Sequence, residues 1–211
     1  MKCDLDKEKI VGLVTKQLNN LFYVEENEVS FIKSQIDNVL SRTEYCFANN
    51  PNKYYKRNGE TYFNPFHSGQ YSIFLYYLSN SIFREKQNNT LSDRIYYLNK
   101  ALNAFDLYYE IELPDIFMLD HPVGSVMGRA KYGNWFSFSQ NCVVGNNKGV
   151  FPTIGEHVNM LSNSKIIGNS IIGNNVIMSA NSYVKDEDIP DNTIVFGSTP
   201  NLILKTHSNS K

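Results

Sequence analysis

The chain has 211 residues, which is enough for one large domain or two small ones. Its 20 basic residues are balanced by 21 acidic ones, so the charge gives no indication of binding to nucleic acid or to an acidic membrane surface. The three cysteines are odd in number and form no CxxC motif, which favours reduced thiols in the cytoplasm.

The first residues of the chain are charged and contain no apolar signal segment. No apolar run approaches the length of a membrane span. We therefore expect a cytoplasmic protein that is not exported and has no membrane span.

The N-terminal half carries the period of amphipathic helices. Two helices are expected within 4–48, each with its apolar residues on one face. The Asn, Pro and Gly content of 49–64 predicts a loop. A third helix at about 66–84 is apolar on most sides, which is typical of a helix buried among others. With a fourth helix at about 91–105, the helical domain is expected to span 1–105.

The C-terminal half is organised by an apolar residue at every sixth position from Ile154 to Val184. Neither the helix period nor strand alternation places apolar residues at this spacing, whereas a fixed short period is typical of a repeat architecture. The pattern predicts a β-helix with three flat faces, in which these rung residues point inward and Asn or Gly occupies corners that need φ > 0. A small or β-branched residue follows four places after each of the first five rungs. The rungs and these small residues are, respectively, Ile154, Met160, Ile166, Ile172, Met178 and Val184, and Val158, Ser164, Ser170, Val176 and Ser182.

The same period extends upstream through Tyr132, Phe138 and Val144. It slips between Val144 and Ile154, so we expect 146–152 to leave the coil as a loop.

Four residues after a rung, Cys142 is expected to be a small core residue. The β-helix domain is expected over 106–205, followed by a disordered tail at 206–211. A helical domain followed by a β-helix places the chain in the α+β class.

One block, Phe117 to Gly124, reads F-M-L-D-H-P-V-G. It is similar to the I-M-L-D-H-A-T-G of the serine acetyltransferases, a family of left-handed β-helix acyltransferases. Asp106 stands fifteen residues before His121, where the family has its Asp at the same distance. Two further stretches, within 62–70 and over 189–197, resemble the family's Y-L-K-G-F-H-A-L-Q and the closing I-P-x-x-T-x-x-x-G of hexapeptide transferases. The resemblance covers about 50–205 and implies a left-handed β-helix.

Transfer of an acetyl group from a thioester to an alcohol requires a base that takes the hydroxyl proton. Neutral histidine suits this role near pH 7, and a carboxylate on its other nitrogen would orient the ring. The resemblance implies that His121 is the base and Asp106 its partner. Glu110 and Asp115 remain alternatives for the carboxylate.

The resemblance also implies acetyl-CoA as co-substrate, held largely by backbone groups in a groove between the β-helices of a homotrimer or of a dimer of trimers. Lys185 is a candidate contact for the CoA phosphates, although a solvated surface charge explains it equally well. No metal is expected, because four scattered histidines offer no evident set of three ligands. The positions that match the family's CoA contacts are Gly145, Asn146, Ser162, Ala180 and Gly197.

At the acceptor site the chain departs from the family. The family binds the serine ammonium with an Asp where this chain has Asn50, and the carboxylate with Arg and His where Val150 and Phe151 stand. Burying a zwitterion without charged partners is costly, so these changes favour a neutral acceptor. They predict O-acetylation of a sugar hydroxyl in a bacterial surface polysaccharide, capsule or O-antigen, or in its precursor. The candidate acceptor contacts are Asp120, Asn50, Phe151, Trp135 and Tyr132.

Several alternatives remain open. Trp135 is equally well explained as a bulky corner residue of the coil. The alternative function is serine O-acetyltransferase of cysteine biosynthesis; N-acetylation of an amino sugar and a catalytically idle β-helix are further possibilities. The expected partners are a carbohydrate acceptor and other copies of the chain. No nucleic acid is expected, and no cysteine synthase complex, because the isoleucine-ended tail that the family inserts into cysteine synthase is absent.

Overall fold

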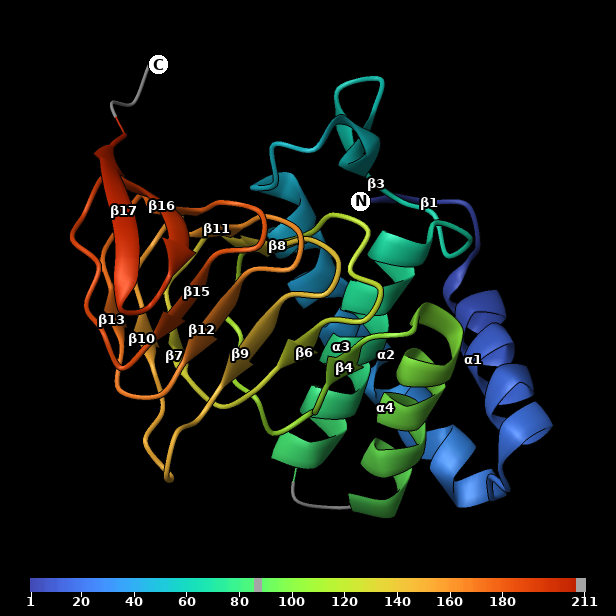
Figure 1. Ribbon diagram of the computed structural model, residues 1–211. Coiled ribbons are helices and arrows are strands. Elements are labelled where there is room, and N and C mark those ends of the chain that lie inside the picture. Colours follow the sequence, from blue (N-terminus) through green and yellow to red (C-terminus); the bar gives the residue numbers. More distant parts are fainter. Residues whose placement is uncertain (86–88, 208–211) are drawn as a thin grey trace. The chain divides into compact units, whose positions relative to one another are not determined.

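The computed structural model describes residues 1–85 and 89–207. The part of the expected C-terminal tail from 208 onward lies outside the described residues. The chain divides into two compact units, one helical and one built of short strands (Figure 1). The helical unit comprises Met1–Asn103 and Tyr108–Glu110, and the strand unit comprises Ala104–Leu107 and Ile111–Lys211.

The four helices expected from the sequence are present. Both N-terminal helices begin at a cap: the Asp6 carboxylate accepts the Lys9 amide at 2.8 Å, and Glu25 forms a capping box with Glu28. Within residues 1–85 and 89–207, no helix is long and apolar enough to cross a membrane. The helices are α1 (Lys7–Leu21), α2 (Glu26–Ala48), α3 (Ser68–Arg84) and α4 (Asn89–Asn103).

α3 is the central helix of the helical unit. Every residue from Gln70 to Ile82 is buried, and the helix packs against α2 and α4. His67 is its N-cap, since the His67 Nδ1 accepts a hydrogen bond from the Gln70 amide at 3.3 Å. The expectation that this apolar helix is buried is therefore confirmed.

The loop expected over 49–64 was in part a wrong prediction, because it contains a hairpin. Asn58 and Gly59 form its turn with φ of +53° and +82°, the geometry in which an Asn-Gly pair is strongly favoured. Strand β3 lies between β2 and β1 in a three-stranded sheet. The elements of this region are β1 (Lys2–Cys3), the 3₁₀ helix η1 (Lys53–Tyr55), β2 (Lys56–Arg57) and β3 (Glu60–Phe63).

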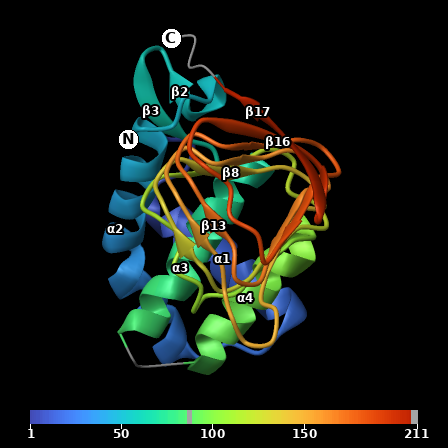
Figure 2. The same cartoon turned by 60° about the vertical axis from the view of Figure 1, so that its left-hand side comes forward.

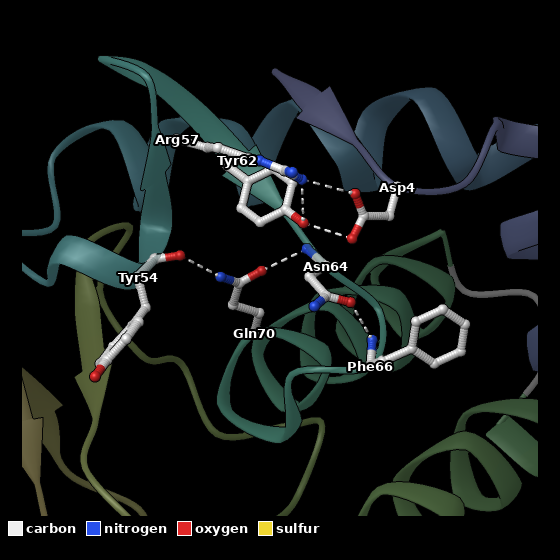
Figure 3. Close-up of polar contacts among 7 residues, drawn as sticks. All are labelled: Asp4, Tyr54, Arg57, Tyr62, Asn64, Phe66 and Gln70. Atoms are coloured by element: carbon white, nitrogen blue, oxygen red, sulfur yellow. Dashed lines mark hydrogen bonds and ion pairs between the residues drawn. The ribbon is translucent and has the colours of Figure 1, made fainter.

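Figure 3 shows how side chains fasten this sheet and the start of α3. The Tyr62 hydroxyl donates to the Asp4 carboxylate, and the Arg57 guanidinium contacts both groups. Gln70 accepts the Asn64 amide at 2.6 Å and donates to the Tyr54 carbonyl at 2.8 Å. These contacts tie the first residues of the chain to the hairpin and the loop to α3.

The strand unit is a left-handed parallel β-helix of about five turns, and Figure 2 shows its coils nested on one another. Its strands form three faces, which the chain visits in the order A, B, C. Strand β17 (Asn201–Thr206) pairs antiparallel with β16 at the end. Face A contains β5 (Phe117–Leu119), β8 (Phe136–Phe138), β11 (Asn159–Met160), β14 (Ile177–Met178) and β16 (Thr193–Ser198); face B contains β4 (Asp106–Leu107), β6 (Val126–Met127), β9 (Val143–Gly145), β12 (Lys165–Ile167) and β15 (Tyr183–Lys185); face C contains β7 (Lys131–Tyr132), β10 (Thr153–Ile154) and β13 (Ile171–Ile172).

The hexapeptide prediction is confirmed in register and burial. Met160 pairs with Phe138 and Met178 on face A, and Ile166 pairs with Val144 and Val184 on face B. All six rungs from Ile154 to Val184 are at most 2% exposed, and the five small residues four places later at most 1%. Stacked rungs of adjacent coils therefore form one continuous apolar core.

The corners of the coil adopt positive φ, as expected. Asn163 and Asn181 lie at the corner between faces A and B, with φ of +64° each, and their side-chain amides are hydrogen bonded at 2.6 Å. The corner between faces C and A has the same geometry, but there Trp135 and His157 occupy two of the positions. We call these the A–B corner and the C–A corner; the turns after face B form the B–C corner.

The slip in the period corresponds to a hairpin at the B–C corner, between β9 and β10 (Figure 1). Asn147 and Val150 exchange both backbone hydrogen bonds at 3.0 Å, and Lys148 and Gly149 form the turn with φ of +51° and +82°. The stacked pair Asn163 and Asn181 is 18 residues apart, whereas the stacked pairs Ser137–Asn159 and Cys142–Ser164, which span this hairpin, are 22 apart. The expected loop over 146–152 is confirmed.

Candidate active site

His121 lies at the first turn of the A–B corner, directly after β5. Its φ is +52°, and its carbonyl accepts a hydrogen bond from the Val123 amide at 2.8 Å. This turn projects the imidazole away from the coil, so that the side chain is 90% exposed. The ring can therefore be reached by a substrate bound on the outside of the β-helix.

The acidic residues considered beside His121 differ in their exposure and in the unit to which they belong. The carboxylate of Asp120 lies 3.9 Å from the His121 Nε2 and is 79% exposed. Asp106 lies half-buried on β4, which pairs with β6 on face B. Of the two alternatives, Asp115 is exposed on the strand unit, whereas Glu110 belongs to the helical unit. The pairing of His121 with Asp106 stays a prediction.

Most of the expected CoA contacts lie along the A–B corner and on face B. Ser162 and Ala180 occupy the same place in consecutive coils, because the Asn181 amide donates to the Ser162 carbonyl at 3.0 Å. Gly145 and Lys185 lie on one ladder of face B, on either side of β12. His121 begins the same corner, so the predicted base and these positions share one edge of the β-helix.

The remaining expected CoA contacts lie at the two ends of face B. Gly197 follows on β16 with φ of +78°, and the adjacent Thr199 hydroxyl accepts the Lys185 amide at 3.1 Å. Asn146 starts the hairpin, where its side-chain oxygen accepts the Gly149 amide at 3.2 Å. The 197–199 segment is thus close to Lys185, while Asn146 belongs to the B–C corner.

Trp135 and Tyr132, two aromatic residues expected to contact a sugar, lie on another corner and another face of the coil than His121. Trp135 lies at the C–A corner and stacks on His157, with ring centroids 4.4 Å apart and an interplanar angle of 4°. Tyr132 lies half-buried on face C, and its hydroxyl donates to the Gly128 carbonyl at 2.6 Å. The corner interpretation of Trp135 is the one that the coil geometry supports.

The other two expected acceptor contacts belong to different units. Phe151 lies in the hairpin of the strand unit and is 42% exposed. Asn50 is buried in the helical unit, where its side-chain oxygen accepts the Asn52 amide at 2.9 Å. Phe151 borders a shallow groove at the B–C corner, and Asn50 serves as a local cap of its own loop.

Sequence reasoning missed two basic residues at this groove. Arg129 and Lys131 border it together with the hairpin, and the register pairs Lys131 with Thr153. The rung pattern contained the signal, because Tyr132 and Ile154 are successive rungs of face C and their neighbours must also stack. Comparing only the hairpin residues with the family's loop could not reveal this.

The hairpin is fastened to Asp186, which follows β15 two coils later. The Asp186 carboxylate accepts the Asn169 amide at 2.8 Å and a hydrogen bond from the Asn147 side chain. The Asn169 amide is the main reason why the pKa of Asp186 lies below its usual value. The base of the hairpin is thereby held in place beside face C.

Comparison with known proteins gives structural matches only. No protein-family model matches the chain, and no curated protein matches it significantly. The serine acetyltransferase of Neisseria gonorrhoeae superimposes with a TM-score of 0.74 at 18% identity, covering 97% of this chain and 82% of that one. The chain has the serine acetyltransferase fold.

Two related structures contain ligands. The Neisseria gonorrhoeae serine acetyltransferase in complex with serine matches with a TM-score of 0.68 at 20% identity, over 92% of this chain and 82% of that one. The Brucella abortus strain S19 serine acetyltransferase in complex with coenzyme A matches with a TM-score of 0.69 at 14% identity, over 99% and 85%. The predicted α+β architecture, with helices followed by a β-helix, is confirmed by this likeness of fold.

The prediction of a polysaccharide acceptor was wrong. The structural neighbours are serine acetyltransferases, and several of them are complexes with serine or with cysteine. Within one chain, Trp135 lies at the C–A corner, Tyr132 on face C and Phe151 in the hairpin, so a single chain does not present the three side chains together as one flat platform for a sugar ring.

Proposed function

We propose that the chain is an acetyl-CoA-dependent O-acetyltransferase whose acceptor is serine. The observation that carries the proposal is the exposed His121 at the first A–B corner of a serine acetyltransferase fold. The F-M-L-D-H-P-V-G block that contains it is similar to the motif of that family. The solved relatives with serine and with coenzyme A support both substrates.

In this reaction the His121 imidazole takes the proton of the serine hydroxyl while the hydroxyl oxygen attacks the thioester carbonyl. The C–S bond then breaks, and the proton passes from the imidazolium to the departing CoA thiolate. Asp120 lies 3.9 Å from the imidazole and provides a carboxylate for the serine ammonium. Asp106 is proposed to orient the ring.

The residues along face B fit an extended thioester substrate. Gly145 is half-exposed, and Ser162 and Ala180 are small, so backbone groups stay accessible at each of these levels. Lys185 lies at the far end of the same ladder and is proposed to meet the CoA phosphates. Acetyl-CoA supplies the activated acyl group, and these residues would hold it beside the A–B corner.

We propose a homotrimer as the active form, either alone or as a dimer of trimers. A general base works best where water is excluded, yet the His121 side chain is 90% exposed. Val123 and Val126 beside it are 56% and 41% exposed, which leaves apolar surface around the base. A second copy packed on this corner would cover both.

The proposal is tested by measuring thiol release from acetyl-CoA with L-serine, simple sugars and capsular oligosaccharides in parallel. Serine should give clear turnover, and the carbohydrates should give none above the rate without acceptor. Absence of turnover with serine in a properly folded, trimeric preparation would refute the proposed acceptor.

A further inference from the structure

The turn that carries His121 is longer than the turns stacked on it in the later coils. Six residues, 120–125, link β5 to β6 at this first A–B corner, whereas four residues link the corresponding strands at the second, third and fourth corners. The strands on either side still pair in register with the next coil, as Val126 does with Val143. The two extra residues therefore leave the line of the coil, which explains why the imidazole projects outward.

Ser125, the last residue of this turn, joins it to the strand that carries Asp106. Ser125 is buried, with 1% of its surface exposed. Its amide donates to the Pro122 carbonyl at 3.1 Å, which closes the turn after His121. Its carbonyl accepts the Asp106 amide at 2.8 Å. One buried residue thus connects the segments of the proposed base and of its proposed carboxylate partner.

The later A–B corners close by a direct backbone hydrogen bond. Each has four residues, and the amide of the fourth donates to the carbonyl of the first. At the third corner, the Ser164 amide donates to the Leu161 carbonyl at 3.1 Å. At the fourth corner, the Ser182 amide donates to the Ser179 carbonyl at 3.0 Å. This bond draws the two ends of the corner together.

At the second corner the Ser125 hydroxyl lies between the equivalent groups. It accepts the Cys142 amide at 3.0 Å and donates to the Ser139 carbonyl at 2.6 Å. Both partners are buried, and a buried amide or carbonyl without a hydrogen bond is costly. One side chain of the first corner therefore sets the width of the second corner.

The second corner in turn supports the turn that carries His121. The Asn141 amide donates to the Val123 carbonyl at 2.9 Å, and the Val123 amide donates to the His121 carbonyl at 2.8 Å. The Asn141 side chain also fills the space beside Gly124, since a Cβ added there would lie 2.2 Å from the side-chain oxygen. A change in the width of the second corner would move both contacts of Asn141 with the turn.

We propose that Ser125 is a positioning residue for His121. This inference rests on the proposed serine acetyltransferase activity, in which His121 is the general base. Without the Ser125 hydroxyl, the Cys142 amide and the Ser139 carbonyl bond directly to each other, as their counterparts do at the later corners. The second corner then contracts, and the imidazole moves out of line with the serine hydroxyl. Ser125 itself contacts no substrate and acts through His121.

Ser125→Ala should lower kcat with serine about tenfold, because a catalytic group displaced by about 1 Å loses much of its effect. Rates are compared per folded molecule, with the folded fraction taken from urea titration. The KM for acetyl-CoA should change less than about twofold, because the proposed CoA contacts begin after the second corner. An unchanged kcat in folded Ser125→Ala would overturn the inference.

Ser182→Ala is the matched control. It removes a buried hydroxyl at the same level of the fourth corner, and this hydroxyl has no hydrogen-bond partner within residues 1–85 and 89–207. The control should leave kcat within about twofold of the wild-type value. A tenfold loss in Ser182→Ala as well would mean that any change at this level of the coil lowers the rate, which contradicts a specific role of Ser125.

A double-variant cycle with His121→Asn tests whether Ser125 acts through the base. If it does, adding Ser125→Ala to His121→Asn should leave the residual rate within about twofold, because the group that Ser125 positions is already absent. A further loss as large as the one seen in the wild-type background would show that Ser125 contributes independently of His121, and the positioning role would be wrong.

Amide hydrogen exchange in the absence of substrate separates this inference from the proposed function. Ser125→Ala should speed exchange of the Asn141 amide about tenfold, the effect of weakening one hydrogen bond, and Ser182→Ala should not. A wild-type protein that does not acetylate serine refutes the proposed function, whatever the exchange shows. Unchanged exchange at Asn141 in Ser125→Ala, in a protein that does acetylate serine, refutes the role of Ser125 alone.

Discussion

Replacing His121 by asparagine should lower kcat with serine by at least about a hundredfold, the usual effect of losing a general base. Asparagine is the informative replacement because it tolerates the φ of +52° at this position, as the corner asparagines of the later coils do. The fold should therefore persist while the proton acceptor is lost. The rate is measured by thiol release at saturating serine and acetyl-CoA.

His157→Asn is the matched control for this variant. His157 is also an exposed corner histidine, with φ of +56°, but it lies at the C–A corner against Trp135. Its replacement restores the residue type found one coil later at Asn175 and should leave kcat within about twofold, since it touches no proposed substrate contact. Near-normal turnover in His121→Asn would remove His121 from the mechanism, whatever the control shows.

Gly155→Ala should destabilise the protein by about 3 kcal/mol, the upper part of the range for overpacking a rigid site. A Cβ at Gly155 would lie 2.7 Å from the Gly173 carbonyl oxygen and 2.8 Å from the Asn174 side-chain oxygen of the next coil. The coils cannot separate there, because the Gly155 amide donates to the Ile172 carbonyl at 2.9 Å. The free energy of unfolding is obtained from urea titration of the two proteins.

Gly12→Ala is expected to have the opposite effect on stability. Gly12 lies within α1, and a Cβ added there meets nothing within 4 Å. Alanine is favoured over glycine in a helix by about 1 kcal/mol, so this variant should be more stable than the wild type. Equal effects of the two glycine replacements would contradict the close coil-to-coil contact described at Gly155.

The β-helix could be predicted from the sequence because its signal is local and repeated. Each rung needs an apolar residue and each corner tolerates positive φ, so a spacing of six encodes both position and orientation. Met160 and Met178 stack as that spacing requires. The hairpin at 146–152 was also predictable, since an insertion must interrupt the count between Val144 and Ile154.

The β2–β3 hairpin was missed although its signal was present. The Asn58-Gly59 pair favours a two-residue turn, but the flanking strands have only two and four residues, so the Asn, Pro and Gly content of the region indicated a loop. At the C–A corner, by contrast, Trp135 gives no such signal, because a bulky side chain is rare at positive φ, and the lone His157 is too weak a signal to define a corner. Only the stacking of coils explains their places.

The candidate site also has one part that the sequence could predict and one part that it could not. His121 could be proposed from its own block, because the residues around it carry the motif. The groove at Arg129 and Lys131 could not be proposed by comparing the hairpin alone, since its two halves meet only through the pairing of Lys131 with Thr153. The prediction of a neutral acceptor therefore relied on Val150 and Phe151 and did not take into account the positive charges of Arg129 and Lys131 beside them.

The proposed reaction places the acetyl group on the hydroxyl oxygen of serine. It is tested most directly by ¹³C NMR of the products formed from serine and carbonyl-labelled acetyl-CoA, with the wild type and His121→Asn run side by side. The wild type should give the ester carbonyl signal of O-acetylserine, and His121→Asn should give only the trace expected from a rate at least about a hundredfold lower. A labelled product on any other acceptor, with no ester on serine, would contradict it.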